Sequence, residues 1–396
     1  MSEMSYLEKL LDGVEVEWKT LGSIAELKRG TSITKKDVID GTIPVVAGGR
    51  TPAYYHNTSN RDGQTIVIAG SGAYAGFVSW WEEPIFVSDA FTVKPHNILL
   101  PRYCYHFLMN MQQQLHEFKS GGGVPHVYPR DVSPILIPIP CPDTPEKSLA
   151  IQSEIVRILD KFSALTAELT AELNMRKKQY NYYRDQLLSF KEGEVEWKSL
   201  EDIALFRRGS FPQPYGNSEW YDGEGCMPFV QVADVADSGF TLHTKTKQQI
   251  SKIAQSKSVF VEAGTIVVTL QGTIGRVAIT QYDCYVDRTL AIFTNFKVKI
   301  NKKYFAYQLK AKFDSEKEFA RGSTLKTITK EEFSKFQLPI PSINEQNRIV
   351  SLLDKFDTLA HSIKQGLPRE IELRQKQYEY YRDLLFNFPK PETVSN

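Results

Sequence analysis

A long duplication is the feature that most constrains this chain of 396 residues. Residues 176–190 read RKKQYNYYRDQLLSF, and residues 374–388 read RQKQYEYYRDLLFNF. In both copies the apolar residues recur every three or four positions, which is the spacing of one face of an α-helix. Upstream, IVRILDKF at residues 155–162 matches IVSLLDKF at residues 349–356. Two near-identical helices predict a protein built from two similar halves.

The duplication continues into the segments that follow the helices. Residues 194–198 repeat the EVEWK of residues 15–19, and the first residues of the chain resemble the end of a helix that stops at Gly13. The start of the chain therefore looks like the continuation of its own last helix. We expect a circular repeat in which the two termini lie near one another.

Short apolar runs fill the segments between the helices. Runs such as residues 43–46, 65–68, 77–80, 84–87 and 135–137 are rich in β-branched and aromatic residues and are separated by Gly, Pro and Asn, which predicts strands.

One helix interrupts the strands of each globule, at residues 102–118 in the first and 304–319 in the second. The expected fold is α+β, with two strand-rich globules joined by two long antiparallel helices. The expected domains are a globule with a short leading helix at 1–143, a helix at 144–192, a second globule at 193–341, and a second helix with a tail at 342–396.

The first connecting helix contains a tandem unit that the second lacks. A seam of apolar residues runs through Ile155, Ile158, Phe162 and Leu165, and a four-residue unit then occurs twice. The tandem consists of Thr166, Ala167, Glu168 and Leu169 followed by Thr170, Ala171, Glu172 and Leu173. Each unit lengthens a helix by about 6 Å, at about 1.5 Å per residue.

Gly366 and Pro368 stand at the matching place in the second helix, where we expect a break. The first helix would therefore act as a rigid spacer, whereas the second would contain a joint.

Composition excludes several classes of protein. The four cysteines are far apart and form no CxxC pair, which argues against a zinc site or a disulfide framework and favours the cytoplasm. No apolar run reaches the length of a membrane span, and the first residues do not resemble an export signal. The net charge of +1 permits a nucleic-acid partner without indicating one.

Catalytic motifs are not found in the sequence. Residues 70–75, GSGAYA, fit a loose dinucleotide-binding pattern, but a predicted strand follows where that motif requires a helix. The sequence has no phosphate-binding GxxxxGK[ST] loop and no (N/D)PP(Y/F) segment of an amino-methyltransferase. The histidines at 96, 106, 116 and 126 follow neither helix nor strand spacing, so we expect no metal site.

The predicted loops do combine basic, aromatic and amide side chains, which can contact phosphates and base edges. In the first globule the candidate DNA-binding residues are Lys28, Arg29, Lys35, Lys36, Arg50, Tyr54, Arg61, Ser71, Tyr74, His126, Tyr128 and Arg130. In the second globule they are Arg207, Arg208, Gln213, Tyr215, Gln231, Lys245, Gln271, Arg276, Arg288, Arg321 and Lys326.

These features together resemble the specificity subunits of type I restriction-modification enzymes, in particular the IC subgroup. The resemblance rests on the duplicated RxKQYxYYRD blocks, the Pro-Ile-Pro segments before each helix, and the tandem at residues 166–173. It covers the whole chain and is weak only inside the globules.

The resemblance implies that each globule is a target recognition domain that reads one half of a split, asymmetric DNA sequence, and that the helices set the spacing between the halves. It also implies a non-catalytic chain that docks two methyltransferase subunits and two restriction subunits. S-adenosylmethionine, ATP and Mg would then be bound by those partners.

Two other hypotheses remain open. The near-neutral charge is compatible with a scaffold whose two globules bind proteins and never touch DNA, in which case partner binding would depend little on salt. A self-contained enzyme would require activity from the isolated chain.

Overall fold

The computed structural model describes residues 6–120, 123–319, 333–361 and 366–390. The chain divides into two compact units. Unit 1 combines residues 1–168 with residues 371–396, and unit 2 comprises residues 169–370. Each unit therefore contains one globule and a part of each connecting helix. Segments from both ends of the sequence form unit 1, as the circular repeat predicts.

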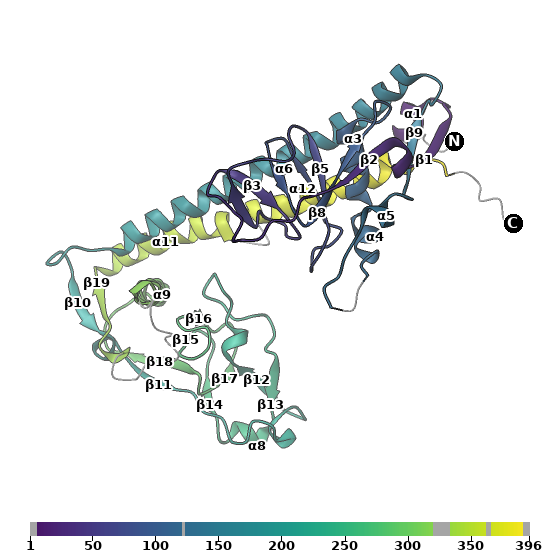
Figure 1. Ribbon diagram of the computed structural model, residues 1–396. Coiled ribbons are helices and arrows are strands. Elements are labelled where there is room, and N and C mark those ends of the chain that lie inside the picture. Colours follow the sequence, from purple (N-terminus) through teal and green to yellow (C-terminus); the bar gives the residue numbers. More distant parts are fainter. Residues whose placement is uncertain (1–5, 121–122, 320–332, 362–365, 391–396) are drawn as a thin grey trace. The chain divides into compact units, whose positions relative to one another are not determined.

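The globule of unit 1 is mainly built from short strands (Figure 1). Its elements are α1 (Tyr6–Leu11), β1 (Val16–Thr20), α2 (Leu21–Ile24), β2 (Ala25–Arg29), β3 (Ile43–Val46), β4 (Tyr54–His56), β5 (Thr65–Ala69), β6 (Val78–Trp81), β7 (Phe86–Val87), β8 (Ala90–Pro95), α3 (Pro101–Asn110), α4 (Gln112–Glu117), α5 (Pro129–Val132) and β9 (Leu136–Pro140). The connecting helices are α6 (Pro145–Leu188), α11 (Ile343–His361) and α12 (Leu367–Leu385).

The globule of unit 2 follows a similar order of elements, with additional short helical elements and one additional strand. Its elements are β10 (Glu196–Ser199), α7 (Leu200–Ile203), β11 (Ala204–Arg208), η1 (Ser218–Trp220), β12 (Met227–Val230), η2 (Val232–Asp234), β13 (Gln248–Ile250), α8 (Lys252–Gln255), β14 (Val259–Val261), β15 (Ile266–Thr269), β16 (Val277–Ile279), β17 (Cys284–Val286), β18 (Leu290–Phe296), α9 (Lys302–Phe319) and β19 (Gln337–Ile340).

The sheets of the two units follow the same plan, except that the second sheet of unit 2 has one additional strand. A four-stranded sheet has the order β2-β8-β5-β6 in unit 1 and β11-β18-β15-β16 in unit 2. A second sheet has the order β4-β3-β7 in unit 1 and β13-β12-β17-β14 in unit 2, and its one parallel pair is β3–β7 or β12–β17. The expected α+β class is therefore confirmed, and the globules share an architecture although they share little sequence.

The repeated EVEWK and Pro-Ile-Pro segments pair with each other. They form the ribbons β1–β9 and β10–β19, in which Trp18 lies opposite Pro138 and Trp197 lies opposite Pro339. A buried tyrosine from the helix of each globule, α3 or α9, donates a hydrogen bond to the carbonyl of that proline. The distance is 3.0 Å from Tyr103 to Pro138 and 3.0 Å from Tyr304 to Pro339. A two-stranded ribbon tolerates proline because its outer N–H groups need no partner strand.

The helix expected at residues 102–118 is interrupted. The structure has α3 and α4 instead, separated at Met111, where ψ is 13°. The side chain of Gln112 accepts a hydrogen bond from Val78 N at 3.0 Å and donates one to Gly76 O at 2.8 Å. These contacts with the turn before β6 depend on tertiary structure, so the local sequence carries no signal for the break.

The connecting helices differ as the sequence predicts. α6 runs without interruption through the tandem at residues 166–173, and the boundary between the units falls inside that tandem, between Glu168 and Leu169. α12 begins immediately after Gly366, whose φ of +79° is not compatible with a continuous helix. The expected continuity of α6 and the expected break at Gly366 are therefore both present.

The predicted apolar seam of α6 is correct only in part. Ile155 and Leu159 are fully buried in the core of unit 1, whereas Ile158 is half-buried and Phe162 stacks on Tyr381 of α12 at 5.1 Å. The helix therefore packs on two sides, against the globule and against the neighbouring helix. In unit 2, Tyr183 likewise stacks on Phe356 of α11 at 5.7 Å.

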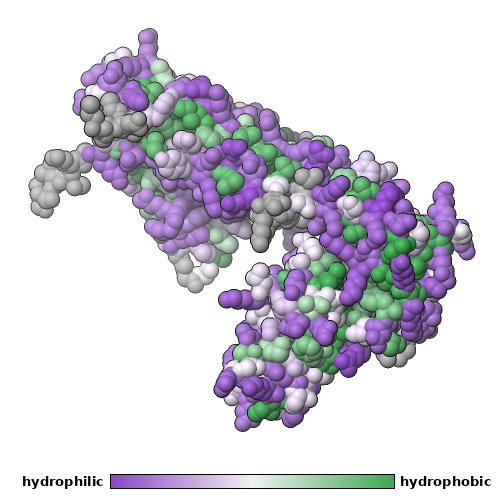
Figure 2. Space-filling model, turned by 180° about the vertical axis from the view of Figure 1, so that it is seen from behind, coloured by the Kyte–Doolittle hydropathy of each residue, from purple (hydrophilic) through white to green (hydrophobic). Residues whose placement is uncertain are grey.

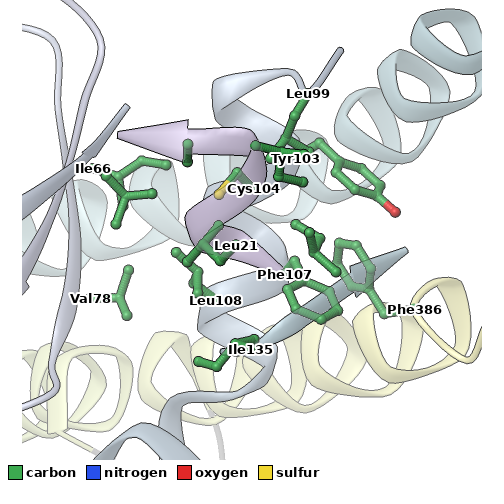
Figure 3. Close-up of a cluster of buried hydrophobic side chains, with 14 of the residues drawn as sticks. Leu21, Ile66, Val78, Leu99, Tyr103, Cys104, Phe107, Leu108, Ile135 and Phe386 are labelled. Atoms are coloured by element: carbon green, nitrogen blue, oxygen red, sulfur yellow. The ribbon is translucent and has the colours of Figure 1, made fainter. Parts of the chain in front are cut away.

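Segments near both termini meet in the core of unit 1. Leu7 and Leu11 of α1 belong to the same buried cluster as Leu385 and Phe386. Figure 3 shows Phe386 beside Phe107 of α3 in this cluster, and the two rings are 5.5 Å apart. The expected proximity of the chain's ends is confirmed for these segments.

A polar network attaches each globule to the two connecting helices. In unit 1, Asp160 of α6 accepts hydrogen bonds from Arg102 Nε at 2.8 Å and from His106 Nε2 at 2.7 Å. His106 Nδ1 lies 3.0 Å from the hydroxyl of Tyr378 in α12, which completes the network.

Unit 2 has the same arrangement with different residues. Asp354 of α11 accepts hydrogen bonds from Lys303 Nζ at 2.7 Å and from the Tyr307 hydroxyl at 2.9 Å, and Tyr307 is hydrogen-bonded to Tyr180 of α6. Both copies thus keep the aspartate and a tyrosine from the other connecting helix, Tyr378 or Tyr180, while Tyr307 replaces His106.

The surface is mostly hydrophilic on the face shown in Figure 2, with apolar residues scattered between polar ones. Among the described residues, no helix is both long enough and apolar enough to cross a membrane.

The network predicts that unit 1, but not unit 2, loses stability in mild acid. Burial, together with Arg102 and Arg382, lowers the pKa of His106 below its ordinary 6.5, although Asp160 opposes this shift. Between that lowered pKa and about 6.5 the unfolded chain binds a proton that the folded chain does not, so stability falls as the pH drops. Hydrogen exchange of α3 and α9, corrected for intrinsic rates, would measure this between pH 7.5 and 5.5.

The variant His106→Gln serves as the control. Its α3 should lose the extra acid sensitivity, while α9, which carries Tyr307 at the equivalent position, should not respond in either protein. Equal acid responses of α3 in the wild type and the variant would contradict the prediction.

Candidate nucleic-acid interface

A close approach between two segments fixes one edge of each globule. In unit 1, a Cβ atom on Gly30 would lie 2.3 Å from the carbonyl oxygen of Ser88, and in unit 2 one on Gly209 would lie 2.1 Å from that of Val286. Only glycine fits at these positions. The repeated Arg-Gly dipeptide therefore lets the end of β2 or β11 pack against the turn before β8 or β18, and it places Arg29 and Arg208 at equivalent strand ends.

Tyr128 is the centre of an aromatic and basic cluster in unit 1. The Arg29 guanidinium lies 5.1 Å from its ring centroid, that of Arg130 lies 4.8 Å away, and the ring of His126 stacks on it at 5.7 Å. Backbone hydrogen bonds hold this segment in place, because Val127 N donates to Gly70 O at 3.0 Å. The cluster joins residues that are far apart in the sequence.

The turn between β5 and β6 borders this cluster. Gly72 N donates to Pro125 O at 2.9 Å, and the hydroxyl of the buried Ser71 is hydrogen-bonded to the Asp89 carboxylate. On the outer side of the turn, the Arg50 guanidinium lies 4.9 Å from the ring centroid of Tyr74. The turn leads into β6 and not into a helix, in agreement with the sequence-based rejection of a dinucleotide site.

The donors of Arg61 are used inside the protein. Its guanidinium donates to Thr92 Oγ1 at 3.1 Å, to Asn60 O at 2.8 Å and to Arg29 O at 2.9 Å. These contacts favour a structural role for Arg61, which holds the end of β2 in position. The sequence alone did not distinguish it from the other arginines.

The remaining candidates of unit 1 lie outside the cluster. Lys28 is exposed on β2, Lys35 and Lys36 are exposed in the following loop, and Tyr54 is half-buried on β4.

Tyr215 occupies the corresponding edge of unit 2. Its ring stacks on Phe211 at 5.0 Å, the Arg288 guanidinium lies 5.1 Å from its centroid, and its hydroxyl donates to Asp287. Burial and this hydrogen bond raise the pKa of Tyr215 to about 12, so that the hydroxyl stays protonated at neutral pH. Asp287 is itself only 3% exposed and also accepts from Thr289 Oγ1 at 2.6 Å.

Two glutamines belong to the same edge. Gln271 follows β15 at the position equivalent to Ser71, and the next residue, Gly272, lies near Val232, which follows Gln231. Leu270 N donates to Thr289 O at 2.9 Å, which joins this turn to the segment of Arg288.

Arg276 is separate from that edge. It forms an ion pair with Asp237 and lines a small cavity of about 150 Å³ together with Tyr180, Arg184 and Tyr307. It therefore faces the connecting helices. Arg207, Gln213 and Lys245 are exposed, and Arg321 and Lys326 lie outside the described residues.

Sequence reasoning missed the acids of this edge. Asp89, which is exposed, and Asp287, which is buried, each follow a short strand and hold the side chains that were predicted, Ser71 and Tyr215. An acid one or two residues after a short apolar run was the available signal. In the described part of the chain, no group of three or more His, Cys, Asp or Glu residues could hold a metal ion.

Comparison with known proteins identifies the family. The model of the type I restriction modification DNA specificity domain matches the chain twice, at residues 13–176 and 192–373. A curated relative, the EcoR124I/EcoR124II type I restriction enzyme specificity subunit of Escherichia coli, is 42% identical over 429 aligned residues that cover 100% of both chains.

A putative type I restriction enzyme specificity subunit of Haemophilus influenzae is 31% identical, covering 97% of this chain and 98% of its own. The crystal structure of the S subunit of the type I restriction-modification system of Mycoplasma genitalium has the same fold, with a TM-score of 0.59 at 18% identity, over 98% of this chain and 100% of that one. The chain therefore belongs to the family of type I restriction-modification DNA specificity subunits.

Proposed function

We propose that each unit of this non-catalytic specificity subunit reads one half of a bipartite, asymmetric DNA target. The observation that carries this proposal is the shared edge of the two globules. Arg29 and Arg208 occupy equivalent strand ends at this edge, but the side chains beside them differ and come from different segments: His126 and Tyr128 in unit 1, and Tyr215 and Arg288 in unit 2. One architecture with different polar side chains suits two different half-sequences.

The candidate residues fall into groups under this proposal. Arg50, Tyr74, His126, Tyr128 and Arg130 form the reading surface of unit 1, which Ser71 supports through its hydrogen bond to Asp89. Tyr215, Gln231, Gln271 and Arg288 form that of unit 2. Lys28, Arg29, Lys35, Lys36, Arg207, Arg208 and Lys245 are exposed basic residues that would contact phosphates.

α6 would act as the spacer between the half-sites. Its continuity through residues 166–173 supports this role, since an uninterrupted helix transmits an added length of about 6 Å per four-residue unit. One such unit is sufficient to accommodate about one further base pair of roughly 3.4 Å.

The connecting helices would also dock two methyltransferase subunits. Tyr182 is 61% exposed and Tyr380, at the equivalent place in the other copy, is 62% exposed. Exposed tyrosines that recur at equivalent positions suit one protein partner that binds once to each unit. Two restriction subunits would complete the complex, and S-adenosylmethionine, ATP and Mg would be bound by these partners. The complex would work in the cytoplasm, where the four free cysteines stay reduced.

The proposal predicts that the half-sites can be exchanged separately. Replacing residues 19–140 with those of another family member should change one half of the methylated motif and leave the other unchanged, because the edge of unit 1 lies within this segment. Single-molecule sequencing of DNA from cells that express the chain with its methyltransferase partner would map the motif. A change in both halves would contradict the assignment of one half-site to each unit.

A second prediction concerns the spacer. Deleting residues 170–173 should shorten the gap between the half-sites by about one base pair while both half-sequences stay the same, since the deletion removes about 6 Å of helix. The same methylation mapping would detect it. An altered half-sequence at an unchanged gap would show that α6 does not act as the spacer.

The alternative, a scaffold that binds only proteins, predicts a different salt response. Because phosphate contacts release counterions, the affinity of the reconstituted complex for its target duplex should fall steeply between 50 and 200 mM salt. Fluorescence anisotropy with a labelled duplex would measure this. A flat response, or equal affinity for all random duplexes, would favour the scaffold.

A further inference from the structure

The turn before β8 in unit 1 is short and contains no arginine. Two backbone hydrogen bonds frame it, from Thr31 N to Val87 O at 2.9 Å and from Gly30 N to Ala90 O at 2.9 Å. Only two residues, Ser88 and Asp89, lie between these anchors. Ser88 is buried and its Oγ accepts from Ile33 N at 3.2 Å, whereas Asp89 is exposed and accepts from the Ser71 hydroxyl.

The equivalent turn of unit 2 is one residue longer. Its anchors are the hydrogen bonds from Ser210 N to Val286 O at 3.1 Å and from Gly209 N to Leu290 O at 3.1 Å. Asp287, Arg288 and Thr289 lie between them. Asp287 and Thr289 are hydrogen-bonded to each other, whereas Arg288 is exposed. Arg288 therefore has no counterpart in unit 1.

The surroundings of Arg288 fix its direction but do not neutralise its charge. Its guanidinium lies against the Tyr215 ring, and that ring is held by the Phe211 stack and by the hydrogen bond to the buried Asp287. No carboxylate forms an ion pair with Arg288 among the residues that the structure describes, unlike Arg276, which pairs with Asp237. A planar guanidinium held on an aromatic ring loses little conformational entropy when it binds a ligand.

Arg208 provides an internal comparison. It occurs in both copies, as Arg208 and Arg29, each at a strand end and directly before the close-packed glycine. A side chain shared by two globules that read different half-sites suits the phosphate backbone, which every sequence has. A side chain found in only one globule suits a base that only one half-site contains.

We propose that Arg288 reads a guanine in the half-site of unit 2, through two hydrogen bonds from its guanidinium to O6 and N7. This pairing is the commonest specific contact of arginine in the major groove, and it requires the planar fork of donors. The inference rests on the proposed function, because it assumes that this edge of unit 2 contacts DNA.

Two substitutions that preserve charge test the proposal. Arg288→Lys removes the fork and keeps the cation, and Arg208→Lys is the matched control at a position assigned to phosphate. Each full-length variant is expressed with its methyltransferase partner, and methylation is mapped by single-molecule sequencing. The half-site of unit 2 is the half that stays constant when residues 19–140 are exchanged.

In the wild type, one G·C pair of that half-site should be preferred roughly 10- to 100-fold over other pairs, the discrimination expected of a bidentate contact. Arg288→Lys should lower this preference to below about 3-fold at that pair alone, because a point charge does not distinguish guanine in this way. The half-site of unit 1 should stay unchanged, which also reports that the variant folds and assembles. Arg208→Lys should leave the whole motif unchanged.

Three results would overturn the assignment of Arg288. They are a wild-type half-site of unit 2 without a G·C pair, a motif unchanged by Arg288→Lys, and a loss of preference at several pairs or in both halves. If the wild-type complex, with an active partner, methylates no motif at all, the proposed function itself fails.

Discussion

An aspartate on a connecting helix attaches each globule to the connecting helices, and the position of the globule on those helices depends on this attachment. In unit 1, Asp160 binds Arg102 and His106, which fixes α3 to α6. In unit 2, Asp354 binds Lys303 and Tyr307, which fixes α9 to α11. An outer tyrosine from the other connecting helix completes both networks. Because polar networks of this kind require defined geometry, they hold each globule in one orientation on its helices.

A rigid support of this kind explains how the edges of the globules can differ. The four-stranded sheet, the Pro-Ile-Pro ribbon and the buried tyrosine occur in both units, and Tyr103 and Tyr304 are both 3.0 Å from their proline carbonyls. Most residues of the proposed reading surfaces lie at strand ends and in turns, where side chains contribute little to the core. A specificity subunit needs this separation, since its half-sites must be able to change while its docking to partners stays the same.

A glycine and an acid together shape the reading edge. Gly30 and Gly209 permit a backbone approach that no other residue allows, and Asp89 and Asp287 hold the neighbouring hydroxyl groups. The arginines nearby have two roles. Arg61 uses its donors inside the protein and supports the edge, whereas Arg288 is exposed on the surface of the edge.

The sequence by itself determined the duplication, the α+β class, the continuous α6 and the break at Gly366, because helix periodicity and turn preferences are local properties. Only the tertiary structure decided which basic residues remain available to a ligand. Arg61 uses its donors on the carbonyl of Arg29, 32 residues away, and His106 meets Asp160 across 54 residues. The break at Met111 depends in the same way on distant contacts of Gln112. The engagement of a polar side chain is set by partners that folding brings together, and no local pattern encodes them.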